Sequence, residues 1–299
     1  MTANGRERAG AVVLVGEDGD REYLREPGDR LETDLGVLDV PSAVEPGDVL
    51  ETHLGERFAV RELRGPDLFA HFERTGAPML PRDVGLVVGH TGLAAGDRVL
   101  DAGTGTGVLA ASLGRLGASV LTYERDPEFA AIARENVALA GVAADPDGSD
   151  GGDRDRRGDR SGGHDGDEGR GDDESGGTDG SDDASADPGV GSVVVRTGNV
   201  LDDLDGLAGE TFDVVTLDTR DAPAVAACAP DLLAPGGFLA AYVPFVEGTR
   251  RVVEAARAAG LGEVRTYETL QREMDFDERG SRPSTTGVGH TGYLVFARA

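Results

Sequence analysis

The chain has 299 residues, enough for two domains with separate cores, and a formal net charge of −27. All 29 basic residues are arginine, a composition typical of a protein from a salt-rich cytoplasm. Because the Debye length in molar salt is about 3 Å, this acidity does not exclude a nucleic acid partner. The single cysteine, Cys228, excludes an internal disulfide and a cysteine-rich metal site, and the lack of a long apolar run or an apolar leader in residues 1–10 predicts a cytoplasmic protein without a membrane span.

Short β-type segments fill the N-terminal quarter of the chain. Residues 11–15, 30–38, 49–52 and 58–64 are rich in branched apolar side chains, and Gly, Pro and Asp turns separate them. This pattern predicts a small β-rich module over residues 1–75. A helix over residues 82–90 is expected to lead from it into a second domain.

Strand and helix patterns alternate over residues 76–299, as an α/β domain with a parallel sheet requires. Strands are predicted at 98–101, 119–124, 192–196, 212–218 and 237–243, and helices at 108–116, 127–140, 222–233 and 249–259. Two last strands, at 263–270 and 293–297, are expected to close one edge of the sheet in the antiparallel direction.

An acidic insert interrupts this domain at residues 145–189. It is almost entirely Asp, Gly, Ser and Arg, with 16 acidic residues against 5 arginines, so it cannot form a core and is expected to be a disordered loop. Closing so long a loop costs little, because each doubling of its length adds only about 0.6 kcal/mol. Whether it only solvates the surface or also binds a partner stays open.

A glycine-rich loop, Asp101-Ala-Gly-Thr-Gly-Thr-Gly107, follows the first strand of this domain and opens the next helix. Glycines in this context let a backbone approach a bound nucleotide. A dinucleotide-binding G-x-G-x-x-G motif on Gly103 and Gly105 would need glycine or alanine at position 108, where the chain has Val108. Asp101 would repel a pyrophosphate and attract the ammonium and sulfonium groups of S-adenosylmethionine. The loop therefore favours S-adenosylmethionine as the cofactor.

Three side chains beyond the loop are candidates for holding the adenosine. Glu124 ends the next strand, where a carboxylate can accept both ribose hydroxyls; the alternative is a structural role beside the start of the next helix. Phe129, in the first turn of that helix, is placed to cover the adenosine. Asn199 follows the third strand, where its side-chain carbonyl can accept the adenine amino group, unless it is only a turn residue. The start of the helix that follows the glycine-rich loop is expected to add backbone contacts to the cofactor at Thr106, Gly107, Val108 and Leu109.

The catalytic candidate is Asp218. It ends the strand Phe212-Asp-Val-Val-Thr-Leu-Asp218, at the carboxyl edge where open α/β sheets bind their ligands. The residues that follow, Thr219-Arg-Asp-Ala-Pro223, lack the Asp/Asn-Pro-Pro-aromatic tetrad that methyltransferases use to hold an exocyclic amine. Methylation of such an amine is therefore disfavoured.

Together these motifs resemble the archaeal branch of the tRNA (adenine-N1)-methyltransferases, over nearly the whole chain outside the insert, and the lysine-free composition resembles a haloarchaeal member. The matching segments are Ala77-Pro-Met-Leu-Pro-Arg-Asp83, Val99-Leu-Asp-Ala-Gly-Thr-Gly-Thr-Gly107, Tyr123-Glu-Arg125, Leu217-Asp218, Leu233-Ala-Pro-Gly-Gly237, Tyr242-Val-Pro244, Arg282-Pro283 and His290-Thr-Gly-Tyr-Leu-Val-Phe296. The chain departs from the family pattern at Pro78-Met79-Leu80 and at Arg220, which stands where a proline usually follows the catalytic acid.

This resemblance implies a Rossmann-like class I methyltransferase domain that binds tRNA and makes 1-methyladenosine at T-loop positions 57 and 58. No metal is expected, because adenine N1 is itself a nucleophile. It implies a homotetramer, and it makes Leu80 a cofactor contact. Asp218 would stabilise the positive charge that builds on the adenine or take its proton. Tyr242 and Phe245 are candidates to stack on the extruded base.

Other residues and functions stay as alternatives. His53 and His290 are interpreted as structural rather than catalytic. Five arginines could bind phosphates or pair with the acidic surface: Arg250, Arg251, Arg272, Arg279 and Arg282. A protein methyltransferase of the isoaspartyl type and a non-catalytic tRNA-binding subunit are the competing functions. Asp218 and the ending from His290 to Phe296 argue against the first. The intact glycine loop and Asp218 argue against the second.

Overall fold

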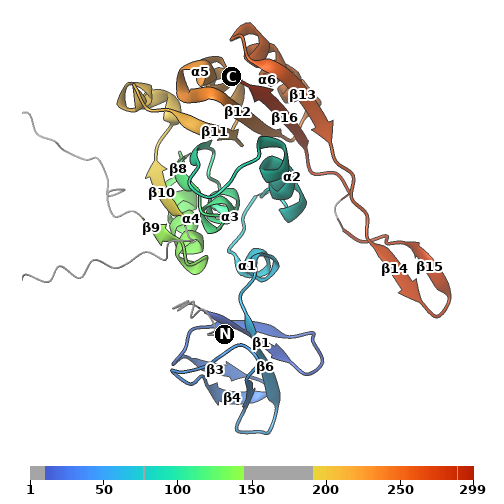
Figure 1. Ribbon diagram of the computed structural model, residues 1–299. Helices are drawn as coiled ribbons and strands as arrows, with labels where there is room; N and C mark the ends of the chain where they lie inside the picture. The colour runs from blue at the N-terminus through green and yellow to red at the C-terminus, as the bar shows by residue number, and fades with distance from the viewer. Residues whose placement is uncertain (1–10, 77, 145–190, 288) are drawn as a thin grey trace, which may run out of the picture.

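The computed structural model describes residues 11–76, 78–144, 191–287 and 289–299. In Figure 1 a small β-rich part at the N-terminus lies below a larger part in which helices cover a twisted sheet. The acidic insert predicted at 145–189 and the polar N-terminus lie outside the described residues. None of the helices in the described ranges is long and apolar enough to cross a membrane.

The N-terminal part contains a four-stranded antiparallel sheet in the order β2-β1-β6-β5. Its strands are β1 (Val12–Gly16), β2 (Glu22–Arg25), β5 (Val49–Glu51) and β6 (Arg57–Glu62). The single strand predicted over 30–38 is wrong: Asp34 and Leu35 form a turn between β3 (Arg30–Thr33) and β4 (Gly36–Asp39), which pair as a hairpin. A short helix, α1 (Gly65–His71), follows.

The larger part is built on an eight-stranded sheet in the order β13-β16-β12-β11-β7-β8-β10-β9. Its parallel strands are β7 (Arg98–Ala102), β8 (Ser119–Glu124), β9 (Ala143–Ala144), β10 (Ser192–Thr197), β11 (Phe212–Leu217) and β12 (Leu233–Val243). The antiparallel closing edge is confirmed, because β16 (Tyr293–Arg298) pairs with both β12 and β13 (Gly262–Glu268).

Alternating apolar residues give the sheet two buried faces. Val99 packs in one cluster with α2 (Pro81–Thr91), α3 (Val108–Arg115) and α4 (Pro127–Leu139), whereas its neighbour Leu100 packs in another with α5 (Ala222–Leu232) and α6 (Val246–Ala258). Because successive strand residues point to opposite faces, this alternation produces three layers, helix, sheet and helix. The predicted doubly wound architecture is confirmed.

Local sequence signals determine where helix α4 begins and how β10 connects to β11. Asp126 caps α4 by accepting a hydrogen bond from the Glu128 amide at 2.9 Å, and Pro127 starts the helix. Two short 3-10 turns, η2 (Val200–Asp202) and η3 (Leu204–Leu207), connect β10 to β11.

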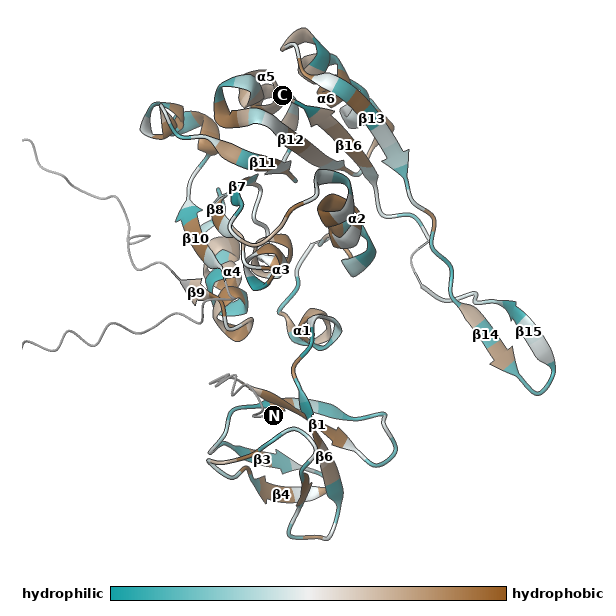
Figure 2. Ribbon diagram, viewed as in Figure 1, coloured by the Kyte–Doolittle hydropathy of each residue, from teal (hydrophilic) through white to brown (hydrophobic). Residues whose placement is uncertain are grey.

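The elements not expected from the sequence include β2, α1, β9 and a hairpin outside the main sheet. A hairpin of β14 (Met274–Asp277) and β15 (Gly280–Pro283) extends away from both parts (Figure 1). Its tip is hydrophilic, in contrast to the hydrophobic strand β11 in the middle of the main sheet (Figure 2). Behind the tip, Phe276 is 77% exposed, so the hairpin presents an uncovered aromatic side chain.

Candidate cofactor and active site

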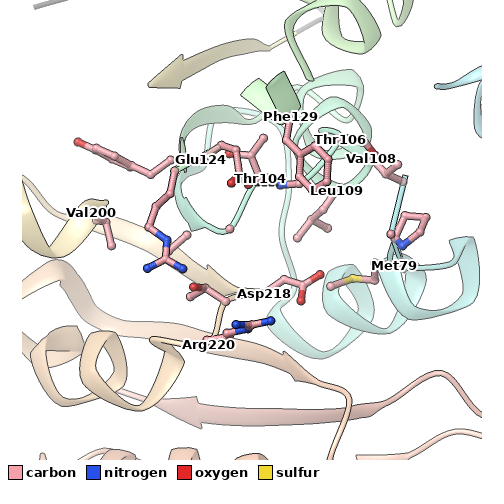
Figure 3. Close-up of a pocket in the computed structure, with 18 of the residues that line it drawn as sticks. Met79, Thr104, Thr106, Val108, Leu109, Glu124, Phe129, Val200, Asp218 and Arg220 are labelled. Atoms are coloured by element: carbon pink, nitrogen blue, oxygen red, sulfur yellow. Dashed lines mark hydrogen bonds between the residues drawn. The ribbon is translucent and has the colours of Figure 1, made fainter. Parts of the chain in front are cut away.

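A cavity lies where the strand order of the sheet changes direction. β7 has β8 on one side and β11 on the other, and ligands of open α/β sheets bind at such a switch point, beyond the carboxyl ends of the strands. The cavity has a volume of about 270 Å³ (Figure 3). Most predicted site residues line it: Gly103, Gly105, Thr106, Val108, Leu109, Glu124, Phe129, Asn199 and Asp218. Leu80, Asp101 and Gly107 are not among the lining residues.

Gly103 brings the two central strands together at the base of the cavity. Its φ is +98°, and a Cβ built there would lie 2.1 Å from the carbonyl oxygen of Asp218. On the same side, the Asp218 amide donates to the Ala102 carbonyl at 2.9 Å. Only glycine fits this close approach, so the loop sequence determines where Asp218 lies.

Asp101 lies behind the cavity wall and not on it. Its carboxylate is 1% exposed and accepts hydrogen bonds from the hydroxyls of Thr122 and Thr216, both at 2.6 Å. Burial raises the pKa of the Asp101 carboxyl, although the two threonine hydroxyls act in the opposite direction. Asp101 therefore acts on the cavity through its charge and by holding the neighbouring strands, and not as a lining group.

Glu124 connects the glycine loop to the start of α4. Its Oε2 accepts the Gly105 amide at 2.7 Å, and its Oε1 accepts the Asp126 amide at 3.0 Å. The structural role considered for this residue is therefore present. A carboxylate has about four acceptor positions, so each oxygen keeps capacity for a further donor in the cavity that Glu124 lines.

Thr106 supplies an unsatisfied polar atom in the cavity wall. Its hydroxyl is buried and has no hydrogen-bond partner within the described part of the chain, a condition that is uncommon in folded proteins and costs free energy. Next to it, a Cβ on Gly105 would meet no atom within 4 Å. An orphaned hydroxyl, open space and the carboxylates of Glu124 and Asp218 together fit a ligand that carries hydroxyl, carboxylate and cationic groups, as S-adenosylmethionine does.

Asn199 has structural partners at the rim of the cavity. Its Oδ1 accepts the Leu201 amide at 3.1 Å and so caps η2, while its Nδ2 donates to Asp221 Oδ2 at 3.4 Å. Asp221 also accepts from Arg125 at 3.1 Å. The amide is thereby oriented with its oxygen as an acceptor, and the turn role predicted as one alternative is observed.

Asp218 lines the cavity from the end of β11 and is only partly exposed. Burial, and after it the charges of Asp101 and Glu124, raises the pKa of the Asp218 carboxyl to about 7. Carboxylates with such shifts concentrate at functional sites. A carboxylate that is half ionised near neutral pH can accept a proton or stabilise a nearby positive charge.

Comparison with known proteins places the chain in a family. No protein-family model matches it. The tRNA (adenine(57)-N(1)/adenine(58)-N(1))-methyltransferase TrmI of Methanocaldococcus jannaschii is 32% identical over 291 residues, which cover 96% of this chain and 94% of the relative. The chain belongs to the tRNA (adenine-N1)-methyltransferase family.

Solved structures agree with the fold of this methyltransferase. The tRNA (m1A58) methyltransferase TrmI from Aquifex aeolicus matches with a TM-score of 0.62 and 20% identity, covering 99% of this chain and 98% of that chain. A SAM-dependent O-methyltransferase from Thermotoga maritima matches with a TM-score of 0.68 and 20% identity, covering 98% of this chain and 93% of that chain. These likenesses confirm the predicted class I, Rossmann-like methyltransferase fold with an additional β-rich N-terminal region. The cofactor of the methyltransferase is S-adenosylmethionine.

Neither of the two aromatic residues considered for stacking on the base lines the cavity of the methyltransferase. Tyr242 is 5% exposed and packs in the core cluster of the sheet, and a Cβ on Gly292 would lie 2.8 Å from its ring. Its ring is therefore covered and does not line the cavity. Phe245 is 71% exposed and is also absent from the cavity lining.

The histidines and several arginines considered earlier have local partners. His53 Nδ1 accepts the Val37 amide at 2.8 Å, and His290 lies 3.0 Å from Glu268, as expected of structural residues. Three of the arginines considered for phosphate binding instead form ion pairs: Arg250 with Glu254, Arg279 with Asp277 and Arg282 with Asp275. In the described ranges no cluster of His, Cys, Asp or Glu is arranged to hold a metal.

The cavity of this methyltransferase also includes residues that the sequence did not single out as ligand contacts. Thr75, Gly76, Pro78 and Met79 line one wall from the segment before α2. The resemblance of residues 77–83 to the family marked this segment but selected Leu80, whose carbonyl instead accepts the Val84 amide as α2 begins. Tyr123, Arg125 and Arg220 also line the cavity.

Proposed function

We propose that this protein transfers the methyl group of S-adenosylmethionine to N1 of adenine at positions 57 and 58 of the tRNA T-loop. One observation carries the proposal: Asp218, whose pKa is raised to about 7, shares a cavity with the glycine loop and Glu124. The name of the Methanocaldococcus jannaschii relative supports the substrate. An acid in this position suits a nucleophile that becomes positively charged as it reacts.

The proposed cofactor contacts are the residues that carry polar or apolar groups into the cavity. Glu124 would accept the ribose hydroxyls, and Phe129 would cover the adenosine. The orphaned hydroxyl of Thr106 would gain a partner, and the Asn199 carbonyl would face the adenine amino group. Asp101 would favour the cationic cofactor through its charge, from behind the wall. The backbone of Gly103, Gly105, Val108 and Leu109 would form the remaining contact surface.

When bound, S-adenosylmethionine supplies an electrophilic methyl group on its sulfonium. The residues of the chain then act by position and by charge, because adenine N1 brings its own lone pair. Positive charge spreads from N1 to the amino group as the new N–C bond forms. Ionised Asp218 within hydrogen-bond reach of that amino group would stabilise the charge and accept the proton. The target base must first be extruded from the folded tRNA, at a cost of a few kcal/mol.

Two competing functions make different predictions. With labelled S-adenosylmethionine, pure protein should label unmodified tRNA and leave an isoaspartyl peptide unlabelled. Transcripts with guanosine at position 57, at position 58 or at both would show which adenosine is used. Labelling of the peptide alone would establish the protein methyltransferase instead, and binding of tRNA without any labelling would establish the non-catalytic subunit.

We also propose a homotetramer in which the β14–β15 hairpin takes part. In an isolated chain this hairpin leaves Phe276 and Met274 exposed at 77% and 45%, and apolar side chains on an extended hairpin favour a second protein surface. Light scattering at high potassium chloride concentration should give four times the 30.9 kDa chain mass. Phe276→Ser should lower that mass, whereas the control Leu54→Ser, at a 62% exposed site on the N-terminal part, should not. A monomeric wild type would contradict the proposal.

The last part of the proposal concerns the boundary between the two domains and the cellular environment of the protein. We propose domain boundaries at 1–75 and 76–299, supported by a separate apolar cluster that includes Leu14, Leu31 and Phe58 in the N-terminal part. The other face of β1 carries Val13 and Val15, which belong to the cluster that includes Leu63, Leu68 and Phe72 at and beside α1 and continues into the larger part. A cytoplasmic, halophilic protein fits the lysine-free, acidic composition, and unfolding in dilute buffer with recovery in molar potassium chloride would test the salt requirement.

A further inference from the structure

Arg220 occupies the loop between β11 and α5, two residues after Asp218. Its side chain is exposed and lines the same cavity as Asp218 and Met79. In Figure 3, Arg220 and Asp218 both extend from this loop toward the side on which Met79 lies. The guanidinium therefore stands at the rim of the cavity, on the side where the catalytic candidate reaches into it.

This guanidinium has no ion-pair partner within 4 Å among residues of the described ranges. The neighbouring Asp221 instead pairs with Arg125 at 3.1 Å and accepts from the Asn199 amide. Exposed arginines elsewhere in this acidic chain commonly find a carboxylate, as Arg250 and Arg279 do. Arg220 thus keeps its five donors available at the mouth of the cavity.

The charges inside the cavity and at its rim suit different parts of a substrate. Asp101, Glu124 and Asp218 place negative charge around the site, which attracts a cationic methyl donor and repels a phosphate. A base extruded from RNA can enter such a cavity, but its flanking phosphates have to stay at the rim. A cation at the rim is the group that compensates this repulsion, and an arginine binds a phosphate through two parallel hydrogen bonds.

We propose that Arg220 binds a backbone phosphate next to the target adenosine and so holds the extruded nucleotide at the cavity. This inference rests on the proposed function, since it takes RNA as the substrate. Arg220 contacts substrate and positions it, while Asp218 remains the group at the reacting base.

The first test removes the charge and measures RNA binding directly. Arg220→Gln should weaken tRNA binding by about tenfold, in line with the loss of a charge-assisted hydrogen bond, and should reduce the slope of log K against log salt by about one. Arg220→Lys should retain the slope. The control Arg98→Gln removes a guanidinium that pairs with Glu210 at the amino end of β7, at the opposite edge of the sheet, and should leave tRNA binding unchanged.

The second test removes the phosphate charge instead. A T-arm RNA with one methylphosphonate, placed 5′ or 3′ of the target adenosine, should bind wild type about tenfold more weakly at one of the two positions. Arg220→Gln should be indifferent to that substitution, because the partner is already lost. S-adenosylmethionine binding should be the same in both proteins.

The outcomes separate this inference from the proposed function. Unchanged tRNA affinity and salt slope in Arg220→Gln would overturn the inference even if 1-methyladenosine forms. Weaker binding of S-adenosylmethionine with unchanged tRNA binding would also overturn it. If wild type binds tRNA with the Arg220-dependent slope and forms no 1-methyladenosine, the proposed function fails and the phosphate contact stands.

Discussion

Replacing Asp218 with asparagine should stabilise the fold while it removes activity. The folded state raises the pKa of this carboxyl from 3.8 to about 7, so folding favours the protonated form. An ionised Asp218 therefore costs stability. The cost is absent below about pH 4, grows as the pH rises toward 7 and is fully present above that value. Asparagine has the same shape and no charge, so the variant never carries this cost.

The size of the effect follows from the shift. At 1.36 kcal/mol per unit of pKa, the variant should be more stable than wild type by about 4 kcal/mol at pH 8 and by about 2 kcal/mol at pH 5. The difference between the two pH values, between about 2 and 3 kcal/mol, is the sharper quantity because changes in packing cancel. Asp101 lies close enough to contribute to the shift, so the carboxylates titrate together and the transition is broader than that of one group.

Urea unfolding of both proteins without cofactor, at constant high salt and several pH values between 5 and 8, measures this difference. Glu135→Gln, at an exposed position of α4, is the matched control and should show no pH-dependent gain. A stability difference between Asp218→Asn and wild type that stays constant from pH 5 to 8 would refute the raised pKa. A variant less stable than wild type at pH 8 would refute the argument that burial of this charge costs free energy.

Three further predictions follow from the same cavity. The kcat/KM for S-adenosylmethionine should rise about tenfold per pH unit below pH 7 and level off above it, since ionised Asp218 is the active form; a flat profile between pH 5.5 and 8 would contradict this. Gly103→Ala should destabilise the fold by more than about 3 kcal/mol and abolish cofactor binding, because its Cβ would lie 2.1 Å from the Asp218 carbonyl oxygen. The control Gly105→Ala has open space around its Cβ position and should cost about 1 kcal/mol in thermal unfolding. Equal losses of stability in the two variants would show that the close approach at Gly103 is not limiting. Asn136→Leu should weaken cofactor binding, measured by calorimetry, about tenfold. The reason is that Asn136 Nδ2 donates to the Thr106 carbonyl at 2.7 Å and to the Glu73 carbonyl at 2.9 Å. Unchanged affinity would show that the glycine-rich loop holds its shape without this contact.

Much of the fold follows from short-range patterns in the sequence. The strand from Ser119 to Glu124 begins and ends as predicted, because its apolar alternation is bounded by a glycine turn before it and by Asp126-Pro127 after it. The order of strands around β7 follows from alternating strands and helices together with the glycine loop. The cavity position could therefore be predicted, since the carboxyl ends of β7, β8, β10 and β11 must meet at one edge.

The side-chain directions could not be predicted from the same patterns. Asp101 was expected beside the cofactor, but the threonines that turn its carboxylate inward, Thr122 and Thr216, come from the two neighbouring strands. Their arrangement depends on strand register, which one sequence does not encode locally. The burial of Tyr242 also depends on a residue far away in the sequence. Gly292, which directly precedes β16 and lies 50 residues later, packs against its ring.

The N-terminal hairpin and the β14–β15 hairpin were missed because their strands are only four residues long. Period-two alternation cannot be recognised over so few positions. For β14 and β15 the sequence is also rich in charged residues, and burial does not mark either strand, since Phe276 itself is exposed. No buried apolar face within the described ranges therefore marks this hairpin in the sequence.

The most direct test of the account is the identity of the methylated nucleoside. Wild-type protein, S-adenosylmethionine and an unmodified tRNA transcript are incubated at high potassium chloride concentration, and the T-arm fragment is digested and analysed by mass spectrometry. The account predicts 1-methyladenosine in that fragment with wild type, and at most a trace with Asp218→Asn although that variant still binds the cofactor. A different methylated nucleoside, or equal yields of 1-methyladenosine from both proteins, would contradict it.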